Sequence, residues 1–148
     1  MNIKFCIAVL AVSASLMTGC GAISYPEMTD DAITFEMGTF KNPENDKDLF
    51  GTLEYNGRTY IAFGTVNNSF NDTYIDKCIG YIVNDEDPQD KNRRVYTLAG
   101  DADQNFLIDY DNTVKLMYQP DFWRAIDTKG KEIDIPGYID DLGYDFWK

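Results

Sequence analysis

Hydrophobic residues occur along most of the chain in short runs broken by polar residues, a pattern typical of β-strands. Asn56-Gly57 lies between two such runs, and this dipeptide favours a tight hairpin turn because both positions tolerate positive φ. We therefore predict a hairpin over residues 50–63, with Leu53 opposite Tyr60. Hydrophobic residues occur on both faces of this ribbon, which predicts cover on both sides over part of its length.

Further segments with strand character follow one another along the chain. We predict a first strand at residues 33–40, although residues 26–33 are also compatible with a short helix. The other predicted strands cover residues 73–83, 113–119, a hairpin formed by 93–100 and 105–110, and a third ribbon formed by 122–127 and 132–135. Strands at this spacing indicate a predominantly antiparallel β or an α+β domain.

The C-terminal residues predict a short helix followed by a docked end. Pro136 suits a first helical turn, Ile139 and Leu142 would share its inner side, and Gly143 would end it. Two aromatic residues, Phe146-Trp147, come next, and we expect them to pack on the body of the domain. The complete prediction is one small domain of about six to eight strands with a short C-terminal helix.

The N-terminal residues follow a different pattern. An apolar run at residues 5–17 comes after Lys4 and leads into Thr18-Gly19-Cys20. The run has the length of a signal-peptide core and is too short to span a bilayer, which needs roughly twenty residues. Residues 1–20 resemble the lipobox signal of bacterial lipoprotein precursors, although Met17 stands where leucine is commonest.

The lipobox resemblance implies that the Cys20 thiol receives a diacylglyceryl group and that the chain is cut just before it. Two acyl chains hold a protein stably at a membrane. The expected organisation is a signal peptide at 1–19, the lipidated cysteine and a polar tether at 20–30, and one β-rich domain at 31–148. The expected location is the extracytoplasmic face of a bacterial cell membrane.

The net charge of the chain limits the classes of partner that we expect it to bind. Aspartate and glutamate number 25 against 13 lysines and arginines, which gives a net charge of −12. We expect no nucleic-acid binding, because phosphate contacts need clustered basic residues. The acidic balance indicates solubility, or a basic protein partner.

Several kinds of catalytic or metal site are also excluded by composition. The chain has no histidine, so it has neither a Ser-His-Asp nor a Cys-His nucleophile system and no histidine-ligated metal. Glycine-rich phosphate loops are absent as well. If Cys6 leaves with the signal peptide and Cys20 is acylated, Cys78 remains alone, and we expect it to be a small buried hydrophobic residue in a strand.

One acidic segment is a candidate calcium site. Its spacing resembles the start of an EF-hand loop, and the oxygen ligands would come from Asp101, Asp103, Asn105 and Asp109. Phe106 occupies the position of the loop glycine, and Asn112 that of the bidentate glutamate. The alternative is a hairpin turn without metal, since Asp and Asn favour turns, and no other cofactor is expected.

These observations leave three hypotheses for function. The first is a non-enzymatic lipoprotein that presents an acidic domain to a protein partner, in its sharper form an immunity or inhibitor protein against a basic secreted toxin. The second is a glycan or solute binder that uses exposed aromatic residues, and it predicts a pocket lined by Tyr or Trp. The third is a hydrolase that uses paired carboxylates.

Overall fold

The computed structural model describes residues 23–113 and 119–148. Within these residues nine strands form one sheet, and the only helical segments are three single 3₁₀ turns. The strands are β1 (Met28–Phe35), β2 (Gly38–Lys41), β3 (Leu49–Tyr55), β4 (Arg58–Val66), β5 (Ile75–Ile82), β6 (Arg93–Leu98), β7 (Phe106–Asp111), β8 (Asp121–Ala125) and β9 (Ile139–Asp141). The 3₁₀ turns are η1 (Asp72–Tyr74), η2 (Ile126–Thr128) and η3 (Asp145–Trp147). The predicted single β-rich domain is confirmed.

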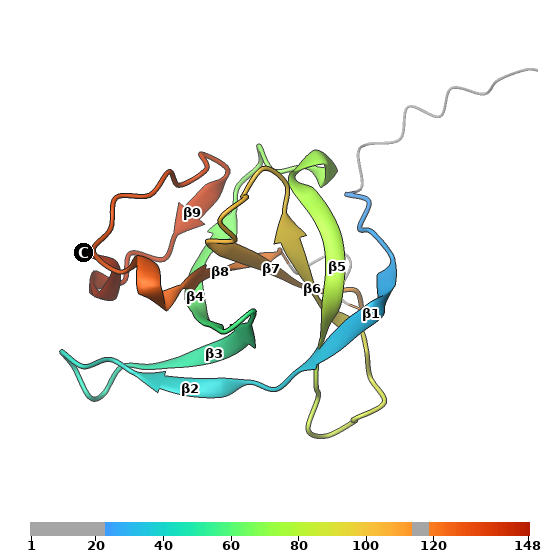
Figure 1. The fold of residues 1–148 in the computed structure, drawn as a ribbon, viewed down its shortest axis with the longest axis horizontal. Coiled ribbons are helices and arrows are strands. Elements are labelled where there is room, and N and C mark those ends of the chain that lie inside the picture. The colour runs from blue at the N-terminus through green and yellow to red at the C-terminus, as the bar shows by residue number, and fades with distance from the viewer. Residues whose placement is uncertain (1–22, 114–118) are drawn as a thin grey trace, which may run out of the picture.

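The sheet curls back on itself (Figure 1). Its strand order is β1-β5-β6-β7-β8-β4-β3-β2, with β9 added beside β4. Strand β1 pairs with β5 in parallel, and the other neighbours are antiparallel. Strands β1 and β2 lie at opposite ends of this order, yet only Glu36 and Met37 separate them in sequence. The short link brings the two ends of the sheet together.

The inner face of the curl holds a small core. Phe35 of β1 and Tyr55 of β3 come from distant strands, yet their ring centroids are only 6.2 Å apart. Such a contact is possible only on the concave side. The buried members of this inner core are Phe35, Leu53, Tyr60, Ile79, Ile82, Val95, Leu107, Trp123 and Ala125.

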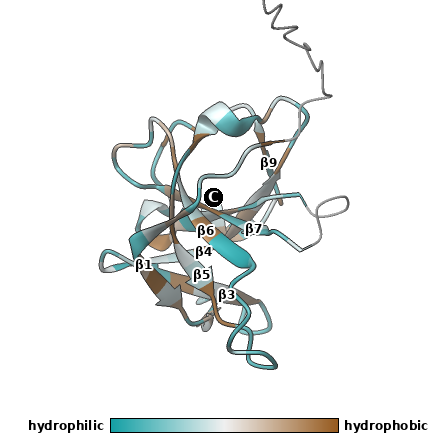
Figure 2. Cartoon of the chain, turned by 90° about the vertical axis from the view of Figure 1, so that its right-hand side faces the viewer, coloured by the Kyte–Doolittle hydropathy of each residue, from teal (hydrophilic) through white to brown (hydrophobic). Residues whose placement is uncertain are grey.

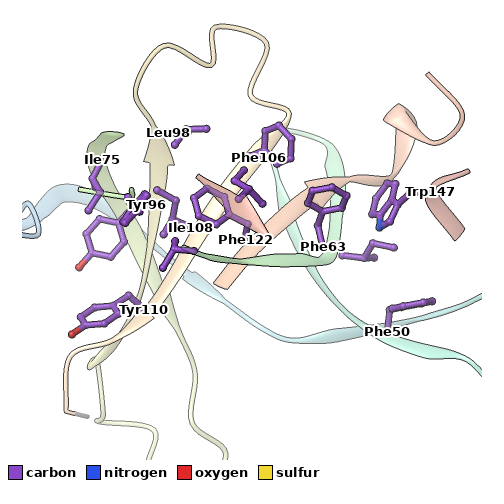
Figure 3. Packing of buried hydrophobic residues seen from close by; sticks show 14 of the residues in the cluster. Phe50, Phe63, Ile75, Tyr96, Leu98, Phe106, Ile108, Tyr110, Phe122 and Trp147 are labelled. Carbon is purple, nitrogen blue, oxygen red and sulfur yellow. The ribbon is translucent and has the colours of Figure 1, made fainter. Parts of the chain in front are cut away.

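The outer face carries a larger and more aromatic core (Figure 3). Strand residues such as Phe63 and Phe122 are covered by the C-terminal segment and by residues 67–74. Phe146 and Trp147 are 2% and 8% exposed, so the predicted docking of the C-terminal aromatic pair is confirmed. The connecting loops are mostly hydrophilic, which is consistent with their position at the surface (Figure 2).

Two predicted hairpins are confirmed. Asn56 and Gly57 both have positive φ, and β3 and β4 pair with Leu53 opposite Tyr60, as the two-residue turn requires. Strands β6 and β7 form the second hairpin. The predicted strand around Cys78 is also present as β5, and Cys78 is fully buried. The strand predicted at residues 113–119 lies almost entirely outside the described residues.

The N-terminal part of the fold differs from expectation. The single strand predicted at 33–40 is two strands, β1 and β2, and the alternative helix at 26–33 is wrong because Met28–Phe35 lies along β5. Gly80 allows this close approach, since a Cβ there would lie 2.1 Å from the Ile33 carbonyl oxygen. The folded domain also includes residues expected in the tether, because β1 begins at Met28 and Tyr25 packs on the outer core.

The C-terminal helix predicted from Pro136 is wrong. Residues Ile139–Asp141 form β9 and pair with Gly64–Val66 of β4. Strand β3 pairs with β4 no further than Ile61, so the rest of that edge would have unpaired backbone groups, and β9 pairs with them instead. Leu142, expected on an inner helical side, is 45% exposed.

The third ribbon, predicted from residues 122–127 and 132–135, is also absent from the described structure, so this prediction is wrong. Residues 132–135 form no strand, although Asp121–Ala125 does so as β8. Both edges of β8 are already occupied, by β7 on one side and by β4 on the other. No edge is left for a hairpin partner, and residues 132–135 instead run over the outer face, where Ile133 packs against the core.

Candidate functional site

Two site predictions concern lipidation and metal binding. Cys20, the predicted lipid acceptor, lies outside the described residues. Within residues 23–113 and 119–148, no group of three or more Cys, Asp or Glu side chains is arranged to hold a metal ion. The four calcium candidates lie in the described part, and their surroundings show what they contact.

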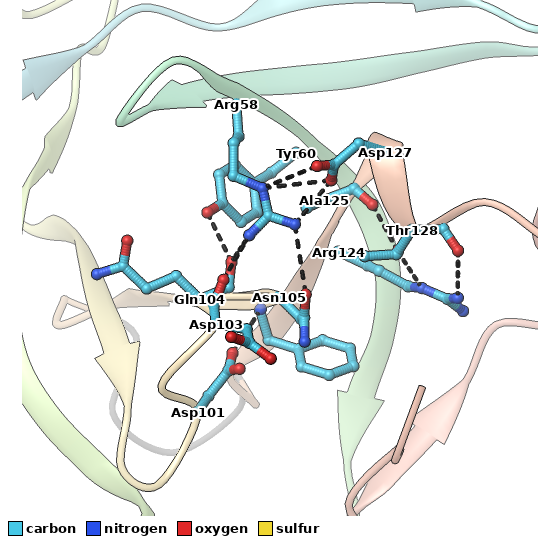
Figure 4. A network of polar contacts seen from close by, with 11 residues as sticks. Arg58, Tyr60, Asp101, Asp103, Gln104, Asn105, Arg124, Ala125, Asp127 and Thr128 are labelled. Carbon is cyan, nitrogen blue, oxygen red and sulfur yellow. Dashed lines mark hydrogen bonds and ion pairs between the residues drawn. The ribbon is translucent and has the colours of Figure 1, made fainter. Parts of the chain in front are cut away.

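The acidic β6–β7 loop binds an arginine on one side (Figure 4). Arg58 donates from Nη1 to the carbonyl oxygens of Asp103 and Gln104, at 2.6 and 2.7 Å. Its Nη2 donates to Oδ1 of Asn105 at 3.3 Å and to Asp127 at 2.7 Å. A guanidinium from the neighbouring hairpin therefore occupies the position at which the loop oxygens converge.

The other two candidates serve separate structural roles. Asp101 accepts a hydrogen bond from the backbone N–H of Phe106 at 2.8 Å, which closes the hairpin turn. Asp109 lies on β7 with a fully buried side chain, and Arg93 donates to it from Nε at 2.9 Å. Burial raises the pKa of Asp109, while the Arg93 hydrogen bond and charge oppose the shift. Asp109 therefore lies on the strand beside Arg93 and does not join the other three calcium candidates in the loop.

An acidic hollow lies between the β6–β7 loop and residues 132–138. It has a volume of about 500 Å³, and none of its described lining residues is basic. Its carboxylates are Asp101, Asp103, Glu132 and Asp134, and its apolar lining includes Leu98, Phe106, Ile133 and Tyr138. Burial raises the pKa of Tyr138 to about 12, with further contributions from Tyr74 and Asp101.

A second hollow, lined partly by residues that precede β1, is different in chemistry. We call it the tyrosine cavity; it has a volume of about 640 Å³. Its described lining consists of Ile23, Tyr25, Glu27, Val66, Asn67, Asn68, Phe70, Arg94, Tyr110, Asn112, Gln119 and Pro120. Aromatic rings, four carboxamides and a single Arg–Glu pair thus surround one concave space.

Tyr25 and Tyr110 form one wall of this cavity, and Tyr96 packs behind it. The rings of Tyr25 and Tyr110 are stacked, with centroids 4.0 Å apart and an interplanar angle of 2°. Tyr96 lies behind Tyr25 at 5.2 Å, and its hydroxyl points to the same side as that of Tyr110 (Figure 3). Burial raises the pKa of Tyr25 and raises the pKa of Tyr96 to about 12, so both phenols stay protonated at neutral pH.

The strand register explains why these groups meet. Arg94 and Tyr96 alternate with inward residues along β6, and Tyr110 is the direct partner of Arg94 across the β6–β7 hairpin. Tyr25 reaches the same place because β1 runs parallel to β5, which lies beside β6. The sequence does not predict this site, because Tyr25 lies within residues 20–30, which the lipobox resemblance makes a tether. The hairpin register alone would have placed Arg94 beside Tyr110.

The comparisons with known proteins add no relative: no family model, no curated protein and no solved structure matches this chain. A search of the described residues finds no helix long and apolar enough to cross a membrane.

Proposed function

We propose that this protein is a non-enzymatic, lipid-anchored binding protein at the extracytoplasmic face of a bacterial membrane, and that its tyrosine cavity binds a saccharide. The support for the anchor is the lipobox-like run that ends at Cys20. Labelling cells with a palmitate analogue tests it. The wild type should incorporate the label and a Cys20→Ala variant should not, and equal labelling of both would contradict the anchor.

The observation that carries the proposed ligand is the stacked pair of Tyr25 and Tyr110 beside four carboxamide side chains. Aromatic faces bury the C–H faces of sugar rings, and amides both donate to and accept from hydroxyl groups. Pockets that bind small molecules combine apolar walls with a few polar groups in this way. The described lining residues carry one Arg and one Glu, which form an ion pair, so their charges balance.

The surroundings of the ionisable groups support binding rather than catalysis. Glycoside hydrolysis needs two carboxyl groups in one cleft, one of them with a raised pKa. Burial does raise the pKa of Asp109, but this residue lies on the inner face of the sheet beside Arg93. It contributes to neither the tyrosine cavity nor the acidic hollow. We propose that no metal or organic cofactor takes part.

Nuclear magnetic resonance titration of the full chain in detergent micelles tests the saccharide site. A screen of neutral and acidic saccharides should shift the side-chain amide signals of Asn68, Asn112 and Gln119, which line the cavity. A Tyr25→Ala variant should weaken binding about tenfold or more, since one stacking ring is lost. Tyr144→Ala is the matched control, because Tyr144 is 40% exposed and lies outside the cavity. Shifts confined to other residues would contradict the proposal.

A second candidate function is capture of a basic secreted protein. An immunity or inhibitor role would be one form of this function. The acidic hollow favours it, because four carboxylates surround an apolar base without a basic residue in the described lining. A lysine or arginine side chain would place its stem on the apolar part and its charge beside the acids. A pull-down from culture supernatant at low and high salt tests this, with Asp134→Asn as the variant. Recovery that is independent of salt and of Asp134 would contradict it.

A further inference from the structure

Two neighbouring polar groups beside the tyrosine cavity lack ordinary hydrogen bonds within the described residues. They are Nε of Arg94 and the hydroxyl of Tyr96, both of them buried atoms. Asn112 and Arg94 both lie close enough to the Tyr96 phenol to lower its pKa, yet neither Nε of Arg94 nor the phenol has a hydrogen bond of good geometry within the described residues. Buried polar groups are nearly always paired. Arg94 also lines the tyrosine cavity, so its guanidinium is a cavity group whose hydrogen-bonding capacity is incompletely used.

The remaining contact of Arg94 is weak. Nη1 of Arg94 lies 3.5 Å from Oε2 of Glu27, and the Glu27 side chain is 92% exposed. Exposed ion pairs of this kind contribute little to stability. Arginine offers five N–H donors in a planar fork that matches a carboxylate or a phosphate. Within the described residues, most N–H donors of this guanidinium therefore have no strong partner, and the side chain lines the tyrosine cavity.

We propose that the saccharide bound in the tyrosine cavity carries an oxyanion, a carboxylate or a phosphate, and that Arg94 binds this group in place of Glu27. The inference rests on the saccharide-binding function proposed above. The oxyanion accepts from the Arg94 fork, and the sugar ring lies against the tyrosine wall. Glu27 leaves at small cost because its side chain is already almost fully exposed.

The net charge of −12 does not prevent this. Interactions between exposed charges are largely screened beyond a Debye length of about 8 Å at physiological ionic strength. Within the described lining of the cavity, Glu27 is the one acidic residue, and its carboxylate is the group that an oxyanion would displace. Among the described lining residues, the charges that a bound oxyanion would meet are therefore those of Arg94 and Glu27.

The experiment compares three sugars that differ at carbon 6: glucose, glucuronic acid and glucose 6-phosphate. The full chain in detergent micelles is titrated with each, and the amide shifts give the affinities. At least one charged sugar should bind about tenfold more tightly than glucose, as expected for an added charge-assisted contact. The tighter of the two identifies the oxyanion as a carboxylate or as a phosphate.

Two variants and one control assign the effect to Arg94. Arg94→Gln should remove the preference for charged sugars, so that glucuronic acid and glucose 6-phosphate bind no more tightly than glucose does. Glu27→Gln should raise the affinity for charged sugars by about threefold, since a competing carboxylate is lost. Lys77→Gln changes the net charge as Arg94→Gln does, but Lys77 is exposed and outside the cavity, so the preference should remain.

The possible failures are distinct. No shifts with any of the three sugars would contradict the proposed function together with this inference. Equal affinity for all three would contradict the oxyanion inference alone. If Arg94→Gln fails to fold, Glu27→Gln still decides, because an unchanged affinity for charged sugars would contradict the exchange of partners at Arg94.

Discussion

The tyrosine cavity and the acidic hollow lie over the same β6–β7 hairpin but differ in chemistry. Tyr110, near the end of β7, lines the cavity, and Phe106, at its start, lines the hollow. The described lining of the cavity has a balanced Arg–Glu pair among amides and tyrosines, whereas that of the hollow has four carboxylates and no basic residue. The negative charge of the chain is therefore unevenly distributed, and net charge alone predicts only one of the two surfaces.

The covering segments explain the difference. The N-terminal residues that precede β1 supply Tyr25 and Glu27 to the cavity, and residues 132–138 cover the hollow. The shared hairpin contributes one aromatic residue to each. A change in the hairpin should therefore alter both sites, whereas a change in one covering segment should alter one.

The largest expected effect is on the hairpin itself. Asp109→Ala should lower the free energy of unfolding by about 3 kcal/mol, because it removes the buried carboxylate to which Arg93 donates. Urea unfolding followed by tryptophan fluorescence measures this. Both the saccharide shifts and the capture of basic protein should weaken together. Loss of one activity with full retention of the other would contradict the shared role of the hairpin.

A smaller effect, on the hollow alone, is expected from Arg58→Ala. The substitution removes the donor that holds the carbonyl oxygens of Asp103 and Gln104, and we expect a loss of about 2 kcal/mol in stability. The β6–β7 loop should then exchange its amide hydrogens faster, which hydrogen exchange detects. Saccharide binding at the tyrosine cavity should be retained. Arg58→Lys, which keeps the charge but lacks the planar fork, should recover only part of the stability.

The strands that carry both sites were easier to predict from the sequence than the sites themselves. The β3–β4 and β6–β7 hairpins were predictable because a local turn signal, such as Asn56-Gly57, sets the register of the flanking strands. Strand β9 was not predictable in this way. Ile139–Asp141 is a strand only because Gly64–Val66, far away in sequence, leaves an edge unpaired.

The same reasoning applies to individual site residues. The spacing of Asp101, Asp103 and Asn105 gave a correct turn, but not the guanidinium of Arg58 to which that loop binds. That contact joins two hairpins, and their relative position depends on the curl of the whole sheet. Tyr25 is a parallel case, because its stacking partner Tyr110 lies far along the chain and no local pattern connects them.

Next in size is Tyr25→Ala, which acts on the cavity alone. The loss of a stacked ring and part of its buried area should lower stability by about 1.5 kcal/mol. The main result should be loss of the saccharide shifts, while capture of basic protein at low salt is unchanged. Tyr25→Phe keeps the ring and should retain most of the stability. If Tyr25→Ala abolished both activities at full folding, the two hollows would not be separate sites.

The smallest expected effect is a difference in pH dependence between two aspartates. The pKa of Asp109 is raised by burial, so its folded state holds a proton more tightly than the unfolded chain does. Stability from this group is fully present below its ordinary pKa of about 3.9 and falls as the pH rises through the raised value. Asp127 behaves oppositely, because the hydrogen bond from Arg58 lowers its pKa.

The stability from Asp127 is present above the ordinary pKa and is lost as the pH falls through its lowered value. Because its side chain is 55% exposed, the effect should stay below about 1 kcal/mol. Unfolding in urea between pH 3 and pH 7 distinguishes the two groups. Relative to the wild type, Asp109→Asn should gain stability as the pH rises, because an amide cannot lose a proton, and Asp127→Asn should lose it. The same slope in both variants would show that burial and pairing do not separate the two aspartates.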